Sequence, residues 1–340
     1  MNKQLLADLC GIDGVSGHEH AVRDNILARL SESTAPMEVH TDNMGNIIVH
    51  LIGKEKANKI VQMDAHMDEV GFIITGITSD GFLRFDTIGG IDSRVLFGHR
   101  VRIGAQKGVI GGKAFHQCGP DDTKKVPSAD SLTIDIGAET QEEAEKLVKI
   151  GDCGTFDNDL KWLGEDVFLG KAVDDRVGCM LLLELAKKQP VRDIWLSFSV
   201  QEEIGLRGAG IATEAIHPDY AVAIDATTAA DVAGNSPDQS VCFAGKGAVV
   251  SFADRATLYD PELYQYIRKI ADKKGIPTQT KTTVAGGNNA GAMQGRHTGV
   301  KMTAVSLPCR YIHSSACMGK VQDVQAMYDL LVLLAEELTK

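Results

Sequence analysis

Two adjacent carboxylates, Glu202 and Glu203, stand where an apolar run of the sequence ends. Residues 194–200 are apolar, aromatic or β-branched at most positions, which predicts a buried strand, and Gly205 then breaks the pattern. Carboxylates at the end of a core strand are costly to bury unless another group pairs with them. The pair is therefore either a solvated turn or one part of a larger polar site. For both side chains to serve one site, the strand must already be turning at Glu202, because neighbouring strand residues point to opposite faces.

Carboxylates and imidazoles also follow other segments of the predicted core. They are Asp64, His66, Asp68 and Glu69 after residues 59–63, Asp174 and Asp175 at the start of a helix, Asp225 after residues 221–224, and His313 after residues 308–312. Ligands of open α/β sheets bind beyond the carboxyl ends of the strands, so these groups are expected to gather at one edge. Leaving that much negative charge unpaired would be expensive, whereas zinc accepts both imidazole nitrogen and carboxylate oxygen. The sequence therefore predicts a divalent cation site.

Each of these residues also has an explanation that needs no metal. His66 can belong to a capped turn, and Asp174 and Asp175 can cap the helix that they open. Asp225 can cap a turn, and His313 can be a hydrogen-bonded histidine of the core. It is the occurrence of all of them at the ends of predicted strands that favours the metal site.

Cys309, His313 and Cys317 form a second metal-like spacing, with three residues between successive members. Three ligands from one short segment lack the fourth group that a closed structural zinc site needs. Both cysteines are therefore expected to be small buried side chains that bind no metal.

The pattern of strands and helices predicts an α/β fold, with a mixed, mostly parallel sheet flanked by helices. Period-two and fully apolar runs predict the strands, and 3.6-residue periodicity predicts the helices. The expected strands are 37–41, 46–51, 59–63, 194–200, 221–224 and 300–307, and the expected helices are 18–32, 177–187, 209–215, 261–274 and 321–340.

The sequence pattern changes between residues 70 and 166, and the new pattern predicts an inserted β-barrel or sandwich. Short β-rich runs recur there between Gly, Asp and Ser residues, at 71–77, 82–86, 100–103, 107–110 and 132–136, and only residues 141–148 have a helical pattern. We therefore expect a discontinuous domain of residues 1–69 and 167–340, interrupted by a small β-rich domain of residues 70–166.

Composition narrows the classes of partner and compartment. The chain has 340 residues and a net charge of −11, which argues against non-specific binding to nucleic acid or to anionic membranes. No run approaches the roughly 18 apolar residues of a membrane helix, and the first residues carry no signal-peptide pattern. The seven cysteines are odd in number and scattered, which favours a reducing cytoplasm over a disulfide framework.

Taken together, these motifs resemble those of the glutamyl-aminopeptidase family, which includes the tetrahedral (TET) aminopeptidases. The matching segments are HMDEVGF at 66–72, KAVDDRVG at 171–178, EEIGLRGA at 202–209, IDAT at 224–227 and YIHS at 311–314, with further similarity at 16–19, 42–46, 108–111 and 135–138. The resemblance covers nearly the whole chain and implies a zinc-aminopeptidase-like fold.

The resemblance implies a dinuclear centre with two divalent metal ions in each subunit, zinc first, with cobalt or manganese as alternatives. Its implied ligands are His66, Asp174, Glu203, Asp225 and His313, with Asp174 shared by both ions. Glu202 would be the general base of a two-metal-activated water, and Asp68 would orient His66. The family also has a cis peptide bond between the residues that match Asp174 and Asp175.

The implied activity is removal of N-terminal residues from short peptides, by dimers that form through the barrel and build a dodecamer. A related dinuclear hydrolase, either a carboxypeptidase or an N-deacylase, is the alternative that uses nearly the same ligands. A glycosidase would need two carboxyl groups flanking a sugar bond, for which adjacent Glu202 and Glu203 are poorly placed. A non-catalytic binding module would bind no metal. One departure from the family is Asn289, which stands where many members carry Asp, so that a negative charge is missing near the expected substrate region.

Overall fold

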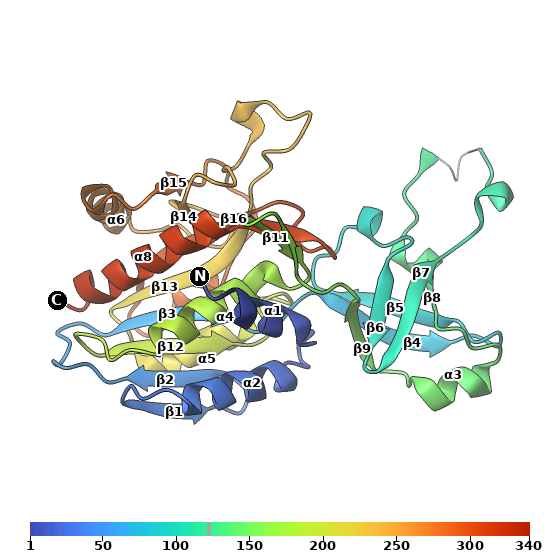
Figure 1. The fold of residues 1–340 in the computed structure, drawn as a ribbon, viewed down its shortest axis with the longest axis horizontal. Helices are drawn as coiled ribbons and strands as arrows, with labels where there is room; N and C mark the ends of the chain where they lie inside the picture. Colours follow the sequence, from blue (N-terminus) through green and yellow to red (C-terminus); the bar gives the residue numbers. More distant parts are fainter. Residues whose placement is uncertain (121–123) are drawn as a thin grey trace.

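The computed structural model describes residues 1–120 and 124–340, and these form two lobes side by side (Figure 1). The larger lobe is built on an eight-stranded sheet with the order β1-β2-β12-β3-β13-β16-β14-β15. The strands are β1 Met37–Thr41, β2 Ile47–Leu51, β3 Val61–His66, β12 Ile194–Ser199, β13 Tyr220–Thr228, β14 Ala248–Val250, β15 Thr278–Thr280 and β16 Lys301–Cys309. The central strands β12, β3, β13 and β16 run parallel to one another. The pairs β1–β2, β2–β12 and β14–β16 are antiparallel. The predicted mixed, mostly parallel sheet is thus confirmed.

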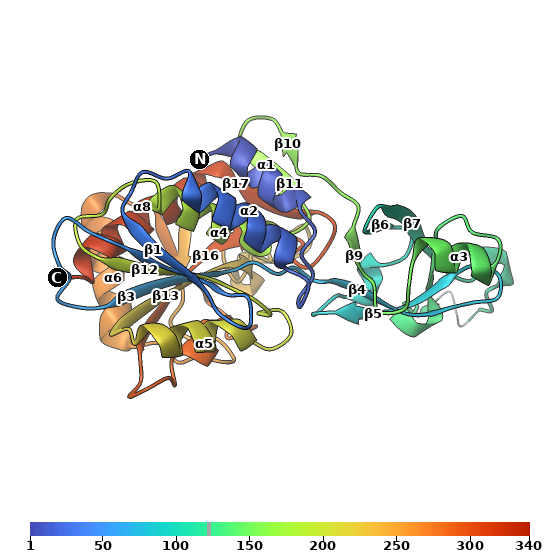
Figure 2. The ribbon, with the colours of Figure 1, turned by 90° about the horizontal axis from the view of Figure 1, so that it is seen from below.

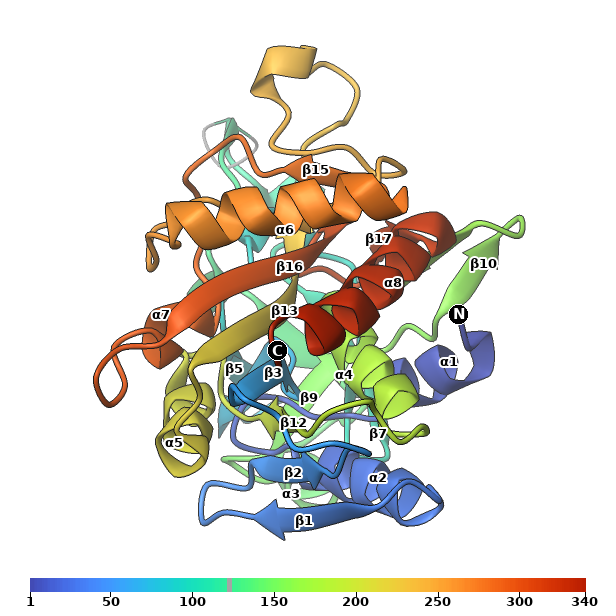
Figure 3. The ribbon, with the colours of Figure 1, turned by 90° about the vertical axis from the view of Figure 1, so that its left-hand side faces the viewer.

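Helices cover both faces of this sheet, as the views in Figures 2 and 3 show. One face carries α1 Lys3–Gly11, α2 His20–Ser31, α4 Val173–Leu185, α6 Pro261–Lys274 and α8 Val321–Glu337. The other face carries α5 Arg207–Ile216 and the short α7 Ala290–Met293. Because both faces are covered, most residues of the central strands are buried, and all those of β3 are.

The second lobe is a closed barrel of six strands in the order β4-β5-β8-β7-β6-β9, with a core of its own. The strands are β4 Gly71–Ile77, β5 Leu83–Ile88, β6 Arg100–Ile103, β7 Gln106–Gly111, β8 Thr133–Asp135 and β9 Cys153–Phe156, and α3 Gln141–Leu147 packs beside them. Phe72 forms edge-to-face contacts with Phe85 and Phe156 in the centre of the barrel. The change of sequence pattern between residues 70 and 166 therefore corresponds to a barrel. The prediction missed β9, the strand that closes this barrel.

A small third sheet has the order β10-β11-β17. It pairs the segment that follows the barrel with the strand that directly precedes α8 of the larger lobe. Its strands are β10 Lys161–Leu163, β11 Val167–Gly170 and β17 Cys317–Lys320. β10 lies before residue 167 but pairs with β11, and Trp162 packs against the core of the larger lobe. The predicted domain boundaries stay a prediction. The pairing of β10 with β11 is relevant to the boundary predicted after residue 166, because it places residues 161–163 in one sheet with residues 167–170.

Short 3-10 helices complete the described elements: η1 Ser93–Val95, η2 Phe115–Gln117, η4 Ala129–Ser131 and η5 Pro237–Gln239. Across the described residues, no helix is both long enough and apolar enough to cross a membrane. All seven cysteines are free thiols, and the cytoplasmic location inferred from them stays a prediction.

The two lobes are tied together by Asp13, which lies just after α1. Its carboxylate accepts hydrogen bonds from Arg102 of β6 at 2.9 Å and from the Thr155 hydroxyl of β9 at 3.1 Å. β3 runs almost directly into β4, so the carboxyl ends of β3 and of its parallel neighbours point toward the barrel side of the sheet. The residues predicted to form the metal site must therefore lie near the junction of the two lobes.

Candidate metal centre

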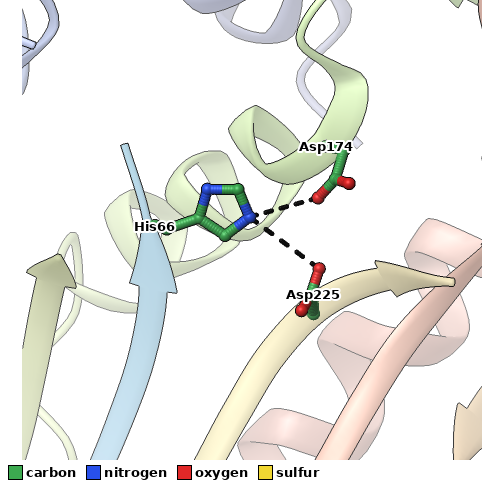
Figure 4. A group of neighbouring side chains, drawn as sticks. All are labelled: His66, Asp174 and Asp225. Carbon is green, nitrogen blue, oxygen red and sulfur yellow. Dashed lines mark hydrogen bonds and ion pairs between the residues drawn. The ribbon is translucent and has the colours of Figure 1, made fainter. Parts of the chain in front are cut away.

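Asp174 stands between two histidines that come from distant parts of the chain. Its Oδ1 lies 3.2 Å from Nε2 of His66, and its Oδ2 lies 3.4 Å from Nε2 of His313. Nε2 of His66 also lies 3.8 Å from Oδ1 of Asp225, and Figure 4 shows this imidazole pointing at both carboxylates. On the far side, Nε2 of His313 lies 3.2 Å from Oε2 of Glu203. The carboxylate of Asp174 thus offers one oxygen to each of two neighbouring groups of ligands.

The start of α4 separates the roles of its two adjacent aspartates. Asp174 and Asp175 have non-helical backbone angles, and the peptide bond between them is cis, as the resemblance implies. The Asp175 carboxylate turns back and accepts a hydrogen bond from the Gly178 backbone N–H at 3.0 Å, as a helix-capping residue does. The capping explanation considered for the pair therefore holds for Asp175, while Asp174 faces the histidines.

The chain turns sharply as β12 ends, which lets Glu202 and Glu203 face the same cluster. β12 ends at Ser199, and Gln201 has a φ of +57°. The backbone N–H groups of Glu202 and Glu203 both donate to the Asp68 carboxylate, at 3.0 and 3.1 Å. The prediction that the strand turns before Glu202 is confirmed.

Asp68 is fully buried and holds several parts of the site at once. It accepts a third hydrogen bond from the Ser16 hydroxyl at 2.6 Å, and its Oδ1 lies 3.4 Å from Nδ1 of His66. Nδ1 of His66 also lies 3.1 Å from the backbone carbonyl of Asp68. Burial alone would raise the pKa of Asp68, but the contact with His66 and these hydrogen bonds outweigh it and lower that pKa. Asp68 is therefore an ionised carboxylate that orients the imidazole without facing Asp174.

His313 lies on an irregular loop between β16 and β17, with a φ of +56°. Its Nδ1 lies 2.9 Å from the carbonyl oxygen of Gly90, a residue of the barrel segment, which directs Nε2 toward Glu203. Cys309 and Cys317 are both buried at the ends of this loop, so the small buried role expected of these cysteines agrees with their surroundings.

Burial and mutual repulsion strongly perturb the carboxylates in the protein alone. Burial, with Asp174 close by, raises the pKa of Glu203 to about 8 and that of Asp225 to about 7. Burial, with further repulsion from Asp225 and Glu203, raises the pKa of Glu202 well above its ordinary value. For His313, burial opposes protonation, but Asp174 and Glu203 outweigh it and raise the pKa to about 10. The cluster therefore attracts more positive charge than its two imidazoles supply.

The donor set fits divalent metal ions. Three groups have ligand atoms within 4.8 Å of one another: His66 with Asp174 and Asp225, His66 with Glu202 and Glu203, and Asp174 with Glu203 and His313. Imidazole nitrogen with carboxylate oxygen suits zinc, and cobalt or manganese in similar geometry. Oε1 of Glu203 is buried and has no hydrogen-bond partner among the described residues, as an atom reserved for a ligand would be. The seven residues that the resemblance assigns to the site thus lie in or directly beside this cluster. Three other carboxylates expected at the same edge have different partners: Asp175 caps α4, Asp64 bonds Ser197 and Ser199, and Glu69 pairs with Lys171.

A cavity of about 250 Å³ opens from the cluster along the edge of the sheet. Its lining includes the carboxylates of Asp174, Glu202, Glu203 and Asp225, and also Lys281 and the loop of residues 285–288. Gly90 and the cavity-lining Lys281 were both missed, because a backbone carbonyl carries no sequence signal and a lone lysine after a short strand is common.

Asn289 lies outside this cavity, although it was expected to affect the substrate region. It is 3% exposed, and its Nδ2 donates to Oδ2 of Asp64 at 2.8 Å and to the Ser199 hydroxyl at 2.9 Å. Asp64 also accepts from the hydroxyls of Ser197 and Ser199, beneath the sheet edge. The residue that departs from the family pattern therefore belongs to a buried polar network and not to the wall of the cavity.

Comparison with known proteins identifies the family. Residues 45–330 match the model of the M42 glutamyl aminopeptidase family. A lysyl aminopeptidase of Pyrococcus furiosus is 34% identical over 98% of this chain and 97% of its own length. An aminopeptidase of the archaeon Desulfurococcus kamchatkensis superposes with a TM-score of 0.92 at 33% identity, covering 98% of this chain and 94% of its own.

The TET1 peptidase of Pyrococcus horikoshii, which can assemble into a tetrahedron or a large octahedral shell, is 34% identical and superposes with a TM-score of 0.86. That match covers 98% of both chains. The agreement thus extends over the larger lobe, the barrel and the loops that carry the site. The chain therefore belongs to the M42 glutamyl aminopeptidase family, which makes it an aminopeptidase by class.

Proposed function

We propose that this protein is a metal-dependent aminopeptidase that removes N-terminal residues from short peptides, with two divalent metal ions in each subunit. The observation that carries the proposal is the position of Asp174, whose two oxygens face His66 and His313 separately, at 3.2 and 3.4 Å. A carboxylate shared in this way matches two ions side by side. His66 and Asp225 would hold one ion, Glu203 and His313 the other, and Asp174 both. Zinc is the first candidate, and cobalt and manganese accept the same ligands.

The balance of charge supports two ions over one. Asp174, Glu202, Glu203 and Asp225 bring four carboxylates into the cluster, and the imidazoles are neutral when they bind a metal. Two divalent ions would compensate all four carboxylates, whereas one would leave two negative charges in a largely buried site.

In the proposed reaction, Glu202 handles the proton. When bound, the metal ions would supply Lewis-acid chemistry, polarising the scissile carbonyl and making water more acidic. Glu202 accepts a proton from the attacking water as the new C–O bond forms, and donates it to the leaving amine nitrogen as the C–N bond breaks. The raised pKa of Glu202 suits a group that must both take up and release a proton.

The remaining polar residues position these groups. Asp68 holds the backbone of Glu202 and Glu203 through two hydrogen bonds and holds His66 by its Nδ1 edge. A carboxylate behind a metal-binding histidine fixes the ring orientation and raises its basicity. The free amino group of a peptide is a cation, and the acidic part of the cavity favours it, which suits an enzyme that acts at the N-terminus.

We also propose that the chain works as a homo-oligomer, in which barrels pair to form dimers and the dimers build a dodecamer. The shells formed by the Pyrococcus horikoshii TET1 peptidase support this proposal. So do large apolar side chains exposed on the barrel segment, among them Phe97 and Phe115, which is 82% exposed. The division into residues 1–69 with 167–340 and residues 70–166 is part of the same proposal.

The Glu202→Gln variant should bind metal like the wild type but hydrolyse peptides about 10²- to 10⁴-fold more slowly, because the amide cannot shuttle the proton. Metal content by mass spectrometry and kcat on aminoacyl p-nitroanilides test this. Glu203→Gln is the matched control, since loss of a metal ligand should lower metal content and activity together. Near-normal turnover in Glu202→Gln would contradict the assignment of Glu202 as the general base.

Chelation of the wild-type protein should abolish hydrolysis of aminoacyl p-nitroanilides, and added zinc, cobalt or manganese should restore it. The melting temperature should also fall on chelation, because the metal binds the folded state. N-acylated amino acids and C-terminal residues of blocked peptides should remain uncut. Cleavage of those substrates in place of free N-termini would favour the N-deacylase or carboxypeptidase alternative.

Asp68→Asn should lower metal affinity and kcat, each by about 10- to 100-fold, because one acceptor oxygen becomes an NH2 group that faces other donors. Asp323→Asn provides a control, since Asp323 is equally buried and also accepts two backbone N–H groups, those of Gly245 and Gly247. Both variants should melt at lower temperature, but only Asp68→Asn should lose metal in a competition titration. Equal metal loss in both would contradict a specific role for Asp68.

Light scattering of the purified protein should give a mass several-fold above the 36.5 kDa of one chain. Phe115→Lys should shift the population toward smaller species, because it places a charge in the proposed barrel contact. A stable 36.5 kDa monomer at micromolar concentration would exclude the assembly.

A further inference from the structure

The two halves of the candidate metal centre are supported in different ways. One group of proposed ligands lies on β3 and β13, where the hydrogen bonds of the central sheet fix it. His313 instead lies on residues 310–316, the His313 loop, which is neither helix nor strand. We propose that the barrel lobe holds this loop, and that His99 and Asn158 are the positioning residues that place His313 for metal binding. This inference rests on the proposed two-metal function and adds residues of the barrel lobe to it.

The His313 loop needs support from outside, because its own backbone is strained. Tyr311 and His313 have φ angles of +58° and +56°, and non-glycine residues keep such left-handed angles only when their surroundings fix them. At the base of the loop, the backbones of Arg310 and Met318 exchange two hydrogen bonds, at 3.0 and 2.9 Å. Within the loop, the Ser314 hydroxyl donates to the carbonyl oxygen of Tyr311 at 2.5 Å. These bonds close the loop, but they do not orient the imidazole of His313.

The contacts that orient the loop come from the barrel lobe. The connection between β5 and β6 meets the loop at both of its ends. At the first end, the carbonyl oxygen of Gly90 lies 2.9 Å from Nδ1 of His313, and at the second, Nδ1 of His99 lies 3.0 Å from the Ser315 hydroxyl. Just after β9, the side-chain amide of Asn158 donates to the carbonyl oxygen of Ser315. Ser315 is only 7% exposed, so these bonds are largely shielded from water.

The barrel can hold the loop because the residues that reach it are themselves fixed. The ring of His99 packs edge-to-face on Phe156 of the barrel core, with ring centroids 5.7 Å apart. The carbonyl oxygen of His99 accepts a hydrogen bond from the backbone N–H of Ile110 at 2.9 Å, and Leu96 of the same connection is fully buried. The position of His313 therefore depends on the packing of the barrel as well as on the larger lobe.

Loss of these contacts should weaken one metal site and spare the other. A polar group behind a metal-binding residue fixes its orientation, and its removal lowers metal affinity by about 10- to 100-fold. His99 and Asn158 act through Ser315, which lies two residues after His313. Their bonds to the loop involve neither β3 nor β13, so the ligands on those strands should keep their positions.

The test titrates metal-stripped protein with Co²⁺ and follows binding by calorimetry and by the visible absorption of bound cobalt. The wild type should bind two ions. His99→Phe, which keeps an aromatic ring against Phe156, and Asn158→Ala should bind one ion normally and the other about 10- to 100-fold more weakly. His99→Asn retains a hydrogen-bonding atom for Ser315 and should bind both ions as the wild type does.

Thr78→Ala is the matched control within the barrel. The Thr78 hydroxyl accepts a hydrogen bond from the Phe82 backbone in the turn between β4 and β5, so its loss should lower the melting temperature without changing cobalt binding. In a double-mutant cycle, Ser315→Ala should add little to His99→Phe, because both remove the same hydrogen bond. Equal weakening of both metal sites in His99→Phe, or unchanged cobalt binding, would mean that His99 only stabilises the barrel and would overturn the proposal.

A second readout needs no metal. In metal-free protein, His99→Phe and Asn158→Ala should speed hydrogen exchange of residues 310–316 several-fold, whereas Thr78→Ala should not. Unchanged exchange of this segment in both variants would overturn the proposal. A wild type that binds fewer than two cobalt ions would instead refute the two-metal proposal, and the exchange rates would still decide the role of His99 and Asn158.

Discussion

The buried carboxylate of Asp68 is the group on which the geometry of the site depends. It accepts from Ser16 near the N-terminus and from two successive backbone N–H groups after β12, and it lies beside His66 at the end of β3. One fully buried charge thus fixes three segments that are far apart in the sequence. Because an ionised carboxylate in the core is tolerated only when its oxygens are satisfied, these segments must come together for Asp68 to be buried as a charged group.

The rest of the site follows from how each strand or helix ends. The turn at Gln201 directs two adjacent glutamates to one cluster, and the irregular start of α4 separates Asp174 from its capping neighbour Asp175. The barrel segment contributes as well, because the carbonyl of Gly90 orients His313. The inserted lobe is therefore not independent of the chemistry: it supplies one of the contacts that direct a proposed metal ligand, and Asp13 holds the two lobes together nearby.

Much of this arrangement was predictable from the sequence, for identifiable reasons. Buried parallel strands are continuous apolar runs, so β3, β12, β13 and β16 were found, and the polar residues near their ends marked the site. Their ends were less accurate, because β3 and β13 continue through Asp64, His66 and Asp225, which were predicted to follow these strands. Strands of three or four residues such as β9, β10 and β14 were missed, because they are too short to show a period and are fixed by their partners. The distant contacts Gly90–His313 and Lys281–Ala285 depend on tertiary packing, which local patterns do not encode.

Asn289 shows how a substitution can mislead when it is considered alone. The loss of a negative charge where many family members carry Asp suggests altered substrate recognition. In the fold, however, Asn289 donates to the buried carboxylate of Asp64, 225 positions earlier in the chain. An aspartate at 289 would set two carboxylates at hydrogen-bond distance in the core, where both could not be ionised. Asn289 is therefore matched to Asp64, and it is not among the residues that line the cavity beside the candidate metal centre.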